Sequence, residues 1–144
     1  MPVSRERKTL FGALSLTTQK FYWKQAEVGN TDYFQQFLRQ LHQAHPDKHL
    51  LMILDNGPIH RAQTIKKFTN KQDWVTLYSL PKYSPEYNPI DRFWKWLKKV
   101  VYGVVSYKGV DDMMKVIRKL IWHYHEGWLV NPIHFNFGIY ANLL

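Results

Sequence analysis

The stretch HLLMILDNGP, residues 49–58, decides the fold class of this chain. Its first six residues form a short continuous apolar run, which predicts a strand buried on both faces and ending at Asp55. A second run, WVTLYSL at 74–80, predicts another strand, closed by Pro81. Residues 60–68 predict a short helix between them. Strand, helix and strand in this order predict a parallel pair with a crossover connection, and therefore an α/β fold.

A stiff loop, PKYSPEYNP at 81–89, follows the second predicted strand. Its three prolines restrict the backbone before a helix for which Asn88 is the expected cap and Pro89 lies in the first turn. Gly103 is expected to end this helix. Asp91 is thus placed in the first turn of a helix whose apolar face consists of Ile90, Phe93, Trp94, Leu97, Val100 and Val101.

Three further elements are expected on either side of this central region. The runs TLFGALSL (9–16) and FYWKQAEV (21–28) predict a hairpin. Gly29-Asn30-Thr31 offers capping residues for a helix that ends near 44–46 and buries Phe34, Phe37, Leu38 and Leu41. A last amphipathic helix carries Val110, Met113, Met114, Ile117, Leu120, Ile121 and Tyr124, and the tail after Gly127 is apolar but irregular.

Composition favours a polyanionic partner. The chain has 144 residues, a formal charge of +9 and a pI near 9.7, and cationic side chains that neutralise phosphates release condensed counterions. Nucleic acid is the first expectation, although other basic proteins bind acidic partners or membrane surfaces. The sequence has no cysteine, which excludes disulfides and thiolate metal sites, and no apolar run long enough to span a membrane. A cytoplasmic protein is expected.

Asp55 and Asp91 are the two acidic residues whose context suggests chemistry. One ends a buried strand and the other opens a helix after the next strand, so their carboxylates are placed to share a hard divalent cation. Two such ions stabilise the attacking and leaving oxygens of a phosphoryl displacement. The structural alternative is a turn residue at Asp55 and a favourable helix N-terminal charge at Asp91.

The sequence motifs around Asp55 and Asp91 favour the metal-ligand role over the structural alternative. LDNGPIHRA and LPKYSPEYNPIDRFWKWLKK, with 35 residues (56–90) between the two aspartates, resemble the catalytic segments of the DDE-superfamily endonucleases in mariner-like bacterial insertion-sequence transposases. The resemblance covers roughly residues 8–104. It implies an RNase H-like fold, Mg²⁺ or Mn²⁺, and cutting and joining of DNA at transposon ends. Asp55 matches the second catalytic carboxylate and Asp91 the third, where this group commonly has Glu.

The family's first catalytic Asp lies on a strand before the FGAL-like segment, and only seven residues precede Lys8. We therefore expect an RNase H-like mixed sheet flanked by helices and lacking the first catalytic strand. Residues 1–104 are the expected partial core, and residues 105–144 a C-terminal helix and tail packed on the same domain. Such a chain is expected to be inactive alone, and to oligomerise or dissolve poorly because apolar surface is left uncovered.

Several residues are expected to support the two aspartates. Asn56 and His60 match residues of the family motif that LDNGPIHRA resembles, and they are candidates for orienting Asp55. Local turn or cap roles are the alternatives. Trp96 is the better candidate for a partner surface than Trp94. The expected partners are transposon-end DNA and a homodimer mate or a complementing N-terminal transposase chain, and the alternatives are a non-catalytic DNA-binding or dimerisation module and a self-sufficient metal nuclease. The expected DNA-backbone contacts are Lys82, Arg92, Lys95, Lys98 and Lys99, for which a solvated helix face is the alternative.

Overall fold

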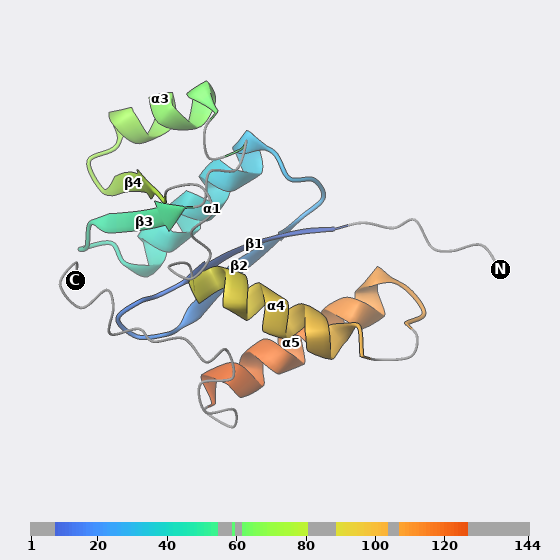
Figure 1. Ribbon diagram of the computed structural model, residues 1–144. Helices are drawn as coiled ribbons and strands as arrows, with labels where there is room; N and C mark the ends of the chain where they lie inside the picture. The colour runs from blue at the N-terminus through green and yellow to red at the C-terminus, as the bar shows by residue number, and fades with distance from the viewer. Residues whose placement is uncertain (1–7, 55–58, 60–61, 81–88, 104–106, 127–144) are drawn as a thin grey trace. The chain divides into compact units, whose positions relative to one another are not determined.

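The computed structural model describes residues 8–54, 59, 62–80, 89–103 and 107–126 (Figure 1). The described residues divide into two compact units. The sheet unit contains those of Thr9–Phe11 and Trp23–Asn88. The helical unit contains those of Met1–Lys8, Gly12–Tyr22 and Pro89–Leu144. Each unit contains helices together with whole strands or parts of strands. This mixture confirms the α/β class.

The sheet unit contains the predicted parallel pair. Strands β3 (Leu50–Leu54) and β4 (Val75–Ser79) lie side by side in Figure 1 and pair in parallel, from Leu50 opposite Val75 to Leu54 opposite Ser79. Helix α3 (Gln63–Lys71) makes the crossover between them. It ends three residues later than the predicted 60–68, because the turn after the buried Phe68 stays helical until the backbone becomes extended at Gln72.

The expectation that residues 49–54 are buried on both faces is wrong for the described part of the chain. Strand alternation puts Leu51 and Ile53 on one face with Thr76 and Tyr78 of β4. On that face Leu51 is 45% exposed and Tyr78 57% exposed. The opposite face contains the buried Leu54 and Val75. A run of apolar residues predicts a strand, but which face of that strand is buried depends on the elements packed around it.

Helix α1 (Thr31–Ala44) agrees with its sequence signals. The Asn30 side chain accepts a hydrogen bond from the Tyr33 N–H at 2.9 Å, which satisfies one of the unpaired donors of the first turn. The helix stops at His45, whose backbone leaves the helical region. Its buried residues are the four predicted ones, Phe34, Phe37, Leu38 and Leu41.

The predicted hairpin is formed by β1 (Thr9–Leu14) and β2 (Phe21–Ala26). The connecting turn is closed by the Ser15 N–H, which donates to the Lys20 carbonyl at 2.9 Å, and Gln19 takes a left-handed conformation with φ of 62°. One end of the hairpin belongs to each unit. Among the described residues, β1–β2 and β3–β4 are separate two-stranded sheets.

The helical unit is built on α4 (Pro89–Val101) and α5 (Val110–His125), which lie side by side in Figure 1. Pro89 is the first helical residue, as expected, while the cap expected at Asn88 lies outside the described residues. The face predicted for α4 is confirmed by its buried and half-buried residues, except at Val100, which is 38% exposed. No helix in the described part of the chain is both long and apolar enough to cross a membrane.

Candidate metal and nucleic-acid site

Asp91 lies in the first turn of α4 and is exposed. The proline before it fixes the backbone at the helix start, and the aligned peptide dipoles favour a carboxylate at this end. Helix α4 therefore presents a charged oxygen donor to solvent from a well-defined position. A hard divalent cation prefers such ligands.

Asp55, the second aspartate of the expected pair, directly follows the end of β3, which the structure describes. Leu54, the last residue of β3, is buried, and its carbonyl accepts the Leu80 N–H at 2.8 Å. Asp55 is the next residue in the chain. Asp55, Asn56, His60 and Lys82 lie outside the described residues, so the convergence of Asp55 and Asp91 stays a prediction. Within the described ranges there is no cluster of three or more His, Cys, Asp or Glu side chains arranged to hold a metal.

The basic residues expected around Asp91 are exposed wherever they are described. They occupy the outer side of α4, and spacings of three and four residues put them on adjacent stripes of the helix. Lys95 stands one turn after Asp91, which is a favourable order for opposite charges on a helix. The outer side of α4 thus presents one carboxylate beside four cations: Arg92, Lys95, Lys98 and Lys99.

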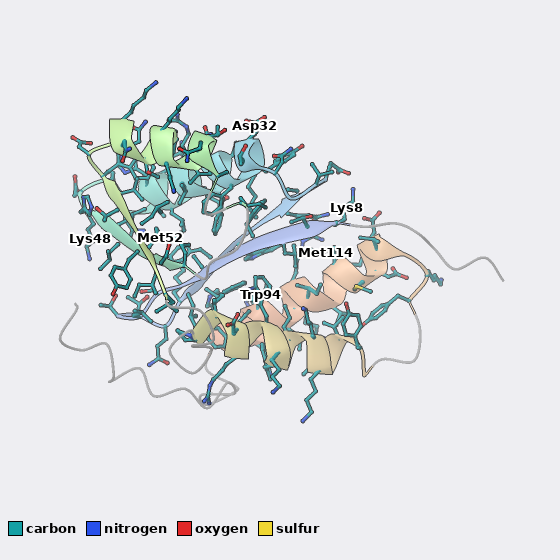
Figure 2. The ribbon with its side chains drawn as sticks, turned by 45° about the horizontal axis from the view of Figure 1, so that its top comes forward. Lys8, Asp32, Lys48, Met52, Trp94 and Met114 are labelled. Carbon is teal, nitrogen blue, oxygen red and sulfur yellow. The ribbon has the colours of Figure 1, made fainter. Side chains whose placement is uncertain are left out.

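An aromatic cluster holds α4 in the helical unit. Phe93 is 0% exposed, and its ring stacks on that of Phe21 from β2 at 4.0 Å between centroids. Tyr124 of α5 meets Phe93 edge to face at 5.2 Å. Trp94 meets Phe21 edge to face at 5.5 Å, and Figure 2 shows it on α4 facing the hairpin. These contacts orient the helix that carries Asp91.

Gly12 makes the close approach of α4 to the hairpin possible. A methyl group at Gly12 would lie 2.6 Å from Trp94 Cζ2 and 2.7 Å from the Phe21 ring. Phe21 is buried and Trp94 packs against the rings of Phe21 and Phe93, so neither neighbour can move aside freely. The glycine in FGAL is therefore needed for space and not for an unusual backbone angle.

The structure does not test the expected role of Trp96 at a partner surface, but it shows the contacts of its ring. Trp96 is half-buried, with its ring 5.5 Å from that of Phe93 and 6.3 Å from that of Tyr124. Trp94 is half-buried as well, because α4 is flanked by the hairpin on one side and α5 on another. Trp122 of α5 is instead the strongly exposed tryptophan of the described chain, at 51%.

Two hydrogen bonds join the end of α5 to the hairpin turn, and sequence analysis missed both. The Tyr124 hydroxyl donates to the Gln19 carbonyl at 2.7 Å, and burial raises the pKa of this tyrosine. The Phe21 N–H donates to His125 Nε2 at 3.0 Å, which requires an imidazole with a lone pair on that nitrogen. Burial, and then the charge of Lys20, lower the pKa of His125, with Glu126 opposing. No local sequence signal pairs residues so far apart.

In this α/β protein one acidic residue opens α4, a second follows β3 in the sequence, and the outer side of α4 is basic. The family model of the DDE superfamily endonucleases matches residues 2–113, more than three quarters of the chain. The chain belongs to this family, as the words around Asp55 and Asp91 indicated. No curated protein matches it.

Proposed function

We propose that this chain is the catalytic portion of a transposase that cuts and joins DNA at transposon ends with a divalent metal. The single observation that carries the proposal is Asp91, an exposed carboxylate in the first turn of α4 within the region matched by the family model. The family supports an endonuclease acting on DNA. The mariner-like type and the RNase H-like arrangement rest on the motif words LDNGPIHRA and NPIDRFW.

Asp55 and Asp91 are the residues that would hold Mg²⁺ or Mn²⁺. The donor set fits such an ion, because carboxylate oxygens are its preferred ligands and Asp91 is accessible to solvent. When bound, the metal supplies charge stabilisation to the phosphate oxygens. Asn56 and His60 are assigned to orienting Asp55.

The exposed cations of α4 are assigned to the DNA backbone. Phosphate contacts from Arg and Lys fix the position of a protein on DNA and carry no sequence information by themselves. Arg92 and Lys95 follow Asp91 within one helical turn, so a phosphate held by them lies near the carboxylate. Lys82 is assigned to the same role from the preceding loop.

We also propose that the polypeptide of residues 1–144 does not cleave DNA by itself. The family resemblance implies three carboxylates, and the matched words supply two of them, Asp55 and Asp91. Supplying the first carboxylate on a complementing transposase chain should restore cleavage. A non-catalytic role in DNA binding is the second candidate, and the four exposed cations of α4 favour it.

The test is a calorimetric Mn²⁺ titration of the wild-type chain and the variant Asp91→Asn. We expect the variant to lose at least tenfold in Mn²⁺ affinity, because an amide supplies one neutral oxygen in place of a carboxylate. The matched control is Asp32→Asn, which removes an exposed first-turn carboxylate from α1. Equal Mn²⁺ binding by Asp91→Asn and wild type would refute the metal site and leave the DNA-binding role.

A cleavage assay tests the second half of the proposal. Residues 1–144 are incubated with Mn²⁺ and transposon-end DNA, and the readout is strand cleavage. We expect none. Cleavage that disappears in Asp55→Ala would show that residues 1–144 complete the site by themselves.

A further inference from the structure

The outer surface of α5 combines cations with an exposed indole ring. Lys115, Arg118, Lys119 and Trp122 are all exposed, and Trp122 is 51% exposed. These residues lie beyond residue 113, where the match to the family model ends. The proposed metal site does not account for them.

Helical geometry places the four residues on one surface, which we call the α5 stripe. Steps of three and four residues bring Lys115, Arg118 and Trp122 into line, and Lys119 lies beside them. At a rise of about 1.5 Å per residue the stripe is roughly 10 Å long. A neighbouring side of α5 is buried within the helical unit through Met114, Ile117 and Ile121.

This division of α5 argues against a membrane-surface role. A helix that lies on a bilayer inserts its apolar face, and the apolar face of α5 is already covered by its own unit. The exposed half of the Trp122 side chain also contributes little to the stability of the fold. The ring of Trp122 is supported by His123, at 5.0 Å between centroids. The stripe therefore offers a flat apolar surface within a positively charged strip.

Charge complementarity points to a polyanion of limited length. Lys115, Arg118 and Lys119 bring three positive charges, and the strip is bounded by negative charge from Asp111 and Asp112 before it and from Glu126 after it. Proteins that bind single-stranded nucleic acid use this combination, with aromatic rings stacking on bases and cations following the backbone. Duplex DNA keeps its bases paired and stacked, so it offers a ring such as Trp122 nothing to stack on.

We propose that the α5 stripe binds a short single-stranded segment of nucleic acid. Trp122 stacks on one unpaired base, and Arg118 with Lys115 and Lys119 holds the neighbouring phosphates. The choice of nucleic acid as the polyanion rests on the proposed function, whereas the residues involved are separate from those of the metal site.

Fluorescence anisotropy with a labelled oligonucleotide of about 12 nucleotides, in EDTA, tests the stacking. Trp122→Ala should weaken single-strand binding by about 5- to 150-fold, the range expected for one stacked base. Trp122→Phe should recover most of the affinity, and binding of a duplex of the same sequence should be unchanged by Trp122→Ala. Unchanged single-strand affinity in Trp122→Ala would overturn the proposal, as would equal losses for the single strand and the duplex.

The phosphate contacts are tested by the salt dependence of the same binding. Arg118→Gln with Lys119→Gln should reduce the slope of log K against log salt by about 1.4, since each single-strand contact contributes about 0.7. The matched control, Lys66→Gln with Lys67→Gln, removes the same charge from exposed positions of α3 and should leave the slope nearly unchanged. Equal reductions in both pairs would mean that net charge alone drives binding, and would overturn the assignment.

Failure of this inference is distinguishable from failure of the proposed function. Asp91→Asn should lose Mn²⁺ binding and keep the Trp122-dependent single-strand affinity. Trp122→Ala should keep Mn²⁺ binding and lose that affinity. Circular dichroism of each variant shows whether it is folded.

Discussion

The two units assemble their cores over different distances along the chain. In the sheet unit, α1 supplies four buried side chains, and Phe11 of β1 packs its ring against Phe34 at 5.9 Å and against Phe37 at 6.1 Å. In the helical unit, two hydrogen bonds join the hairpin to α5, and their partners are separated by 104 and 105 positions in the sequence. Phe21 of β2 also stacks on Phe93 of α4. The contacts of the sheet unit therefore join residues closer together in the sequence than the contacts that join the hairpin to α4 and α5.

This difference matters for the candidate site, because Asp91 is in the helical unit. Closing a long stretch of chain costs conformational entropy before any contact is made, although the cost rises only slowly with length. The aromatic cluster of Phe21, Phe93, Trp94 and Tyr124 offsets that cost. The orientation of Asp91 therefore depends on residues that have no part in metal or DNA chemistry.

The largest expected effect comes from truncating one core at a time. Phe93→Ala should destabilise the helical unit by about 3–5 kcal/mol, and Phe37→Ala should destabilise the sheet unit by a similar amount, because each ring is almost completely buried. Hydrogen exchange measured segment by segment should show the greater loss of amide protection in α4 and α5 for the first variant and in α1 for the second. Uniform loss across the chain in both variants would mean that the two cores unfold as one.

A smaller effect is expected from crowding the hairpin. Gly12→Ala should lower the free energy of unfolding by about 1–3 kcal/mol, because the added methyl group meets Trp94 and Phe21. Gly29→Ala is the control in the sheet unit, where the nearest atom is a methyl group of Thr9 at 3.3 Å. Denaturant unfolding measures both. A Gly12→Ala variant as stable as Gly29→Ala would contradict the close approach of α4 to the hairpin.

The smallest effect is a pH dependence of the helical unit. The folded-state pKa of His125 is lowered by burial and by Lys20, whereas the unfolded side chain titrates near its ordinary value of about 6.5. Below that pH the unfolded state takes up a proton before the folded state does, so the stabilisation present above about pH 6.5 is lost as the pH falls through the folded pKa. His125→Leu removes this titration.

The measurement is the free energy of unfolding from pH 7.5 to 5 for wild type and His125→Leu. The wild type should lose more stability than the variant over this range. Parallel pH profiles would show that the Phe21 to His125 hydrogen bond makes no pH-dependent contribution.

Local elements were largely predictable from the sequence. Asn30 predicted the start of α1, Pro89 the start of α4, and the apolar run before Asp55 the strand β3. The parallel pairing of β3 and β4 followed from the order strand, helix, strand. Each of these signals depends on neighbours within a few residues, so it can be recognised without knowledge of the tertiary structure. The end of α3 was misplaced because no cap residue marks it.

Sequence analysis nominated residues for the candidate site but not their geometry, and their roles stay predictions. Asp91 is exposed at a helix start as expected, and its cationic neighbours are exposed as well. The burial of Leu51 was misjudged, since coverage of a side chain depends on elements packed from elsewhere in the chain. Trp122 lies in a region where the sequence pattern identified only the apolar face of α5.

The sequence by itself therefore determined the α/β class, the hairpin, the capped helix α1 and the two aspartates in their motif words. The tertiary structure decided which tryptophan is exposed, why Gly12 must be small, and how the hairpin is joined to α5. The physical reason is the distance along the sequence over which each effect acts. Propensity, capping and periodicity act over a few residues, whereas burial and the contacts between Phe21, Phe93 and His125 exist only once distant segments have packed together.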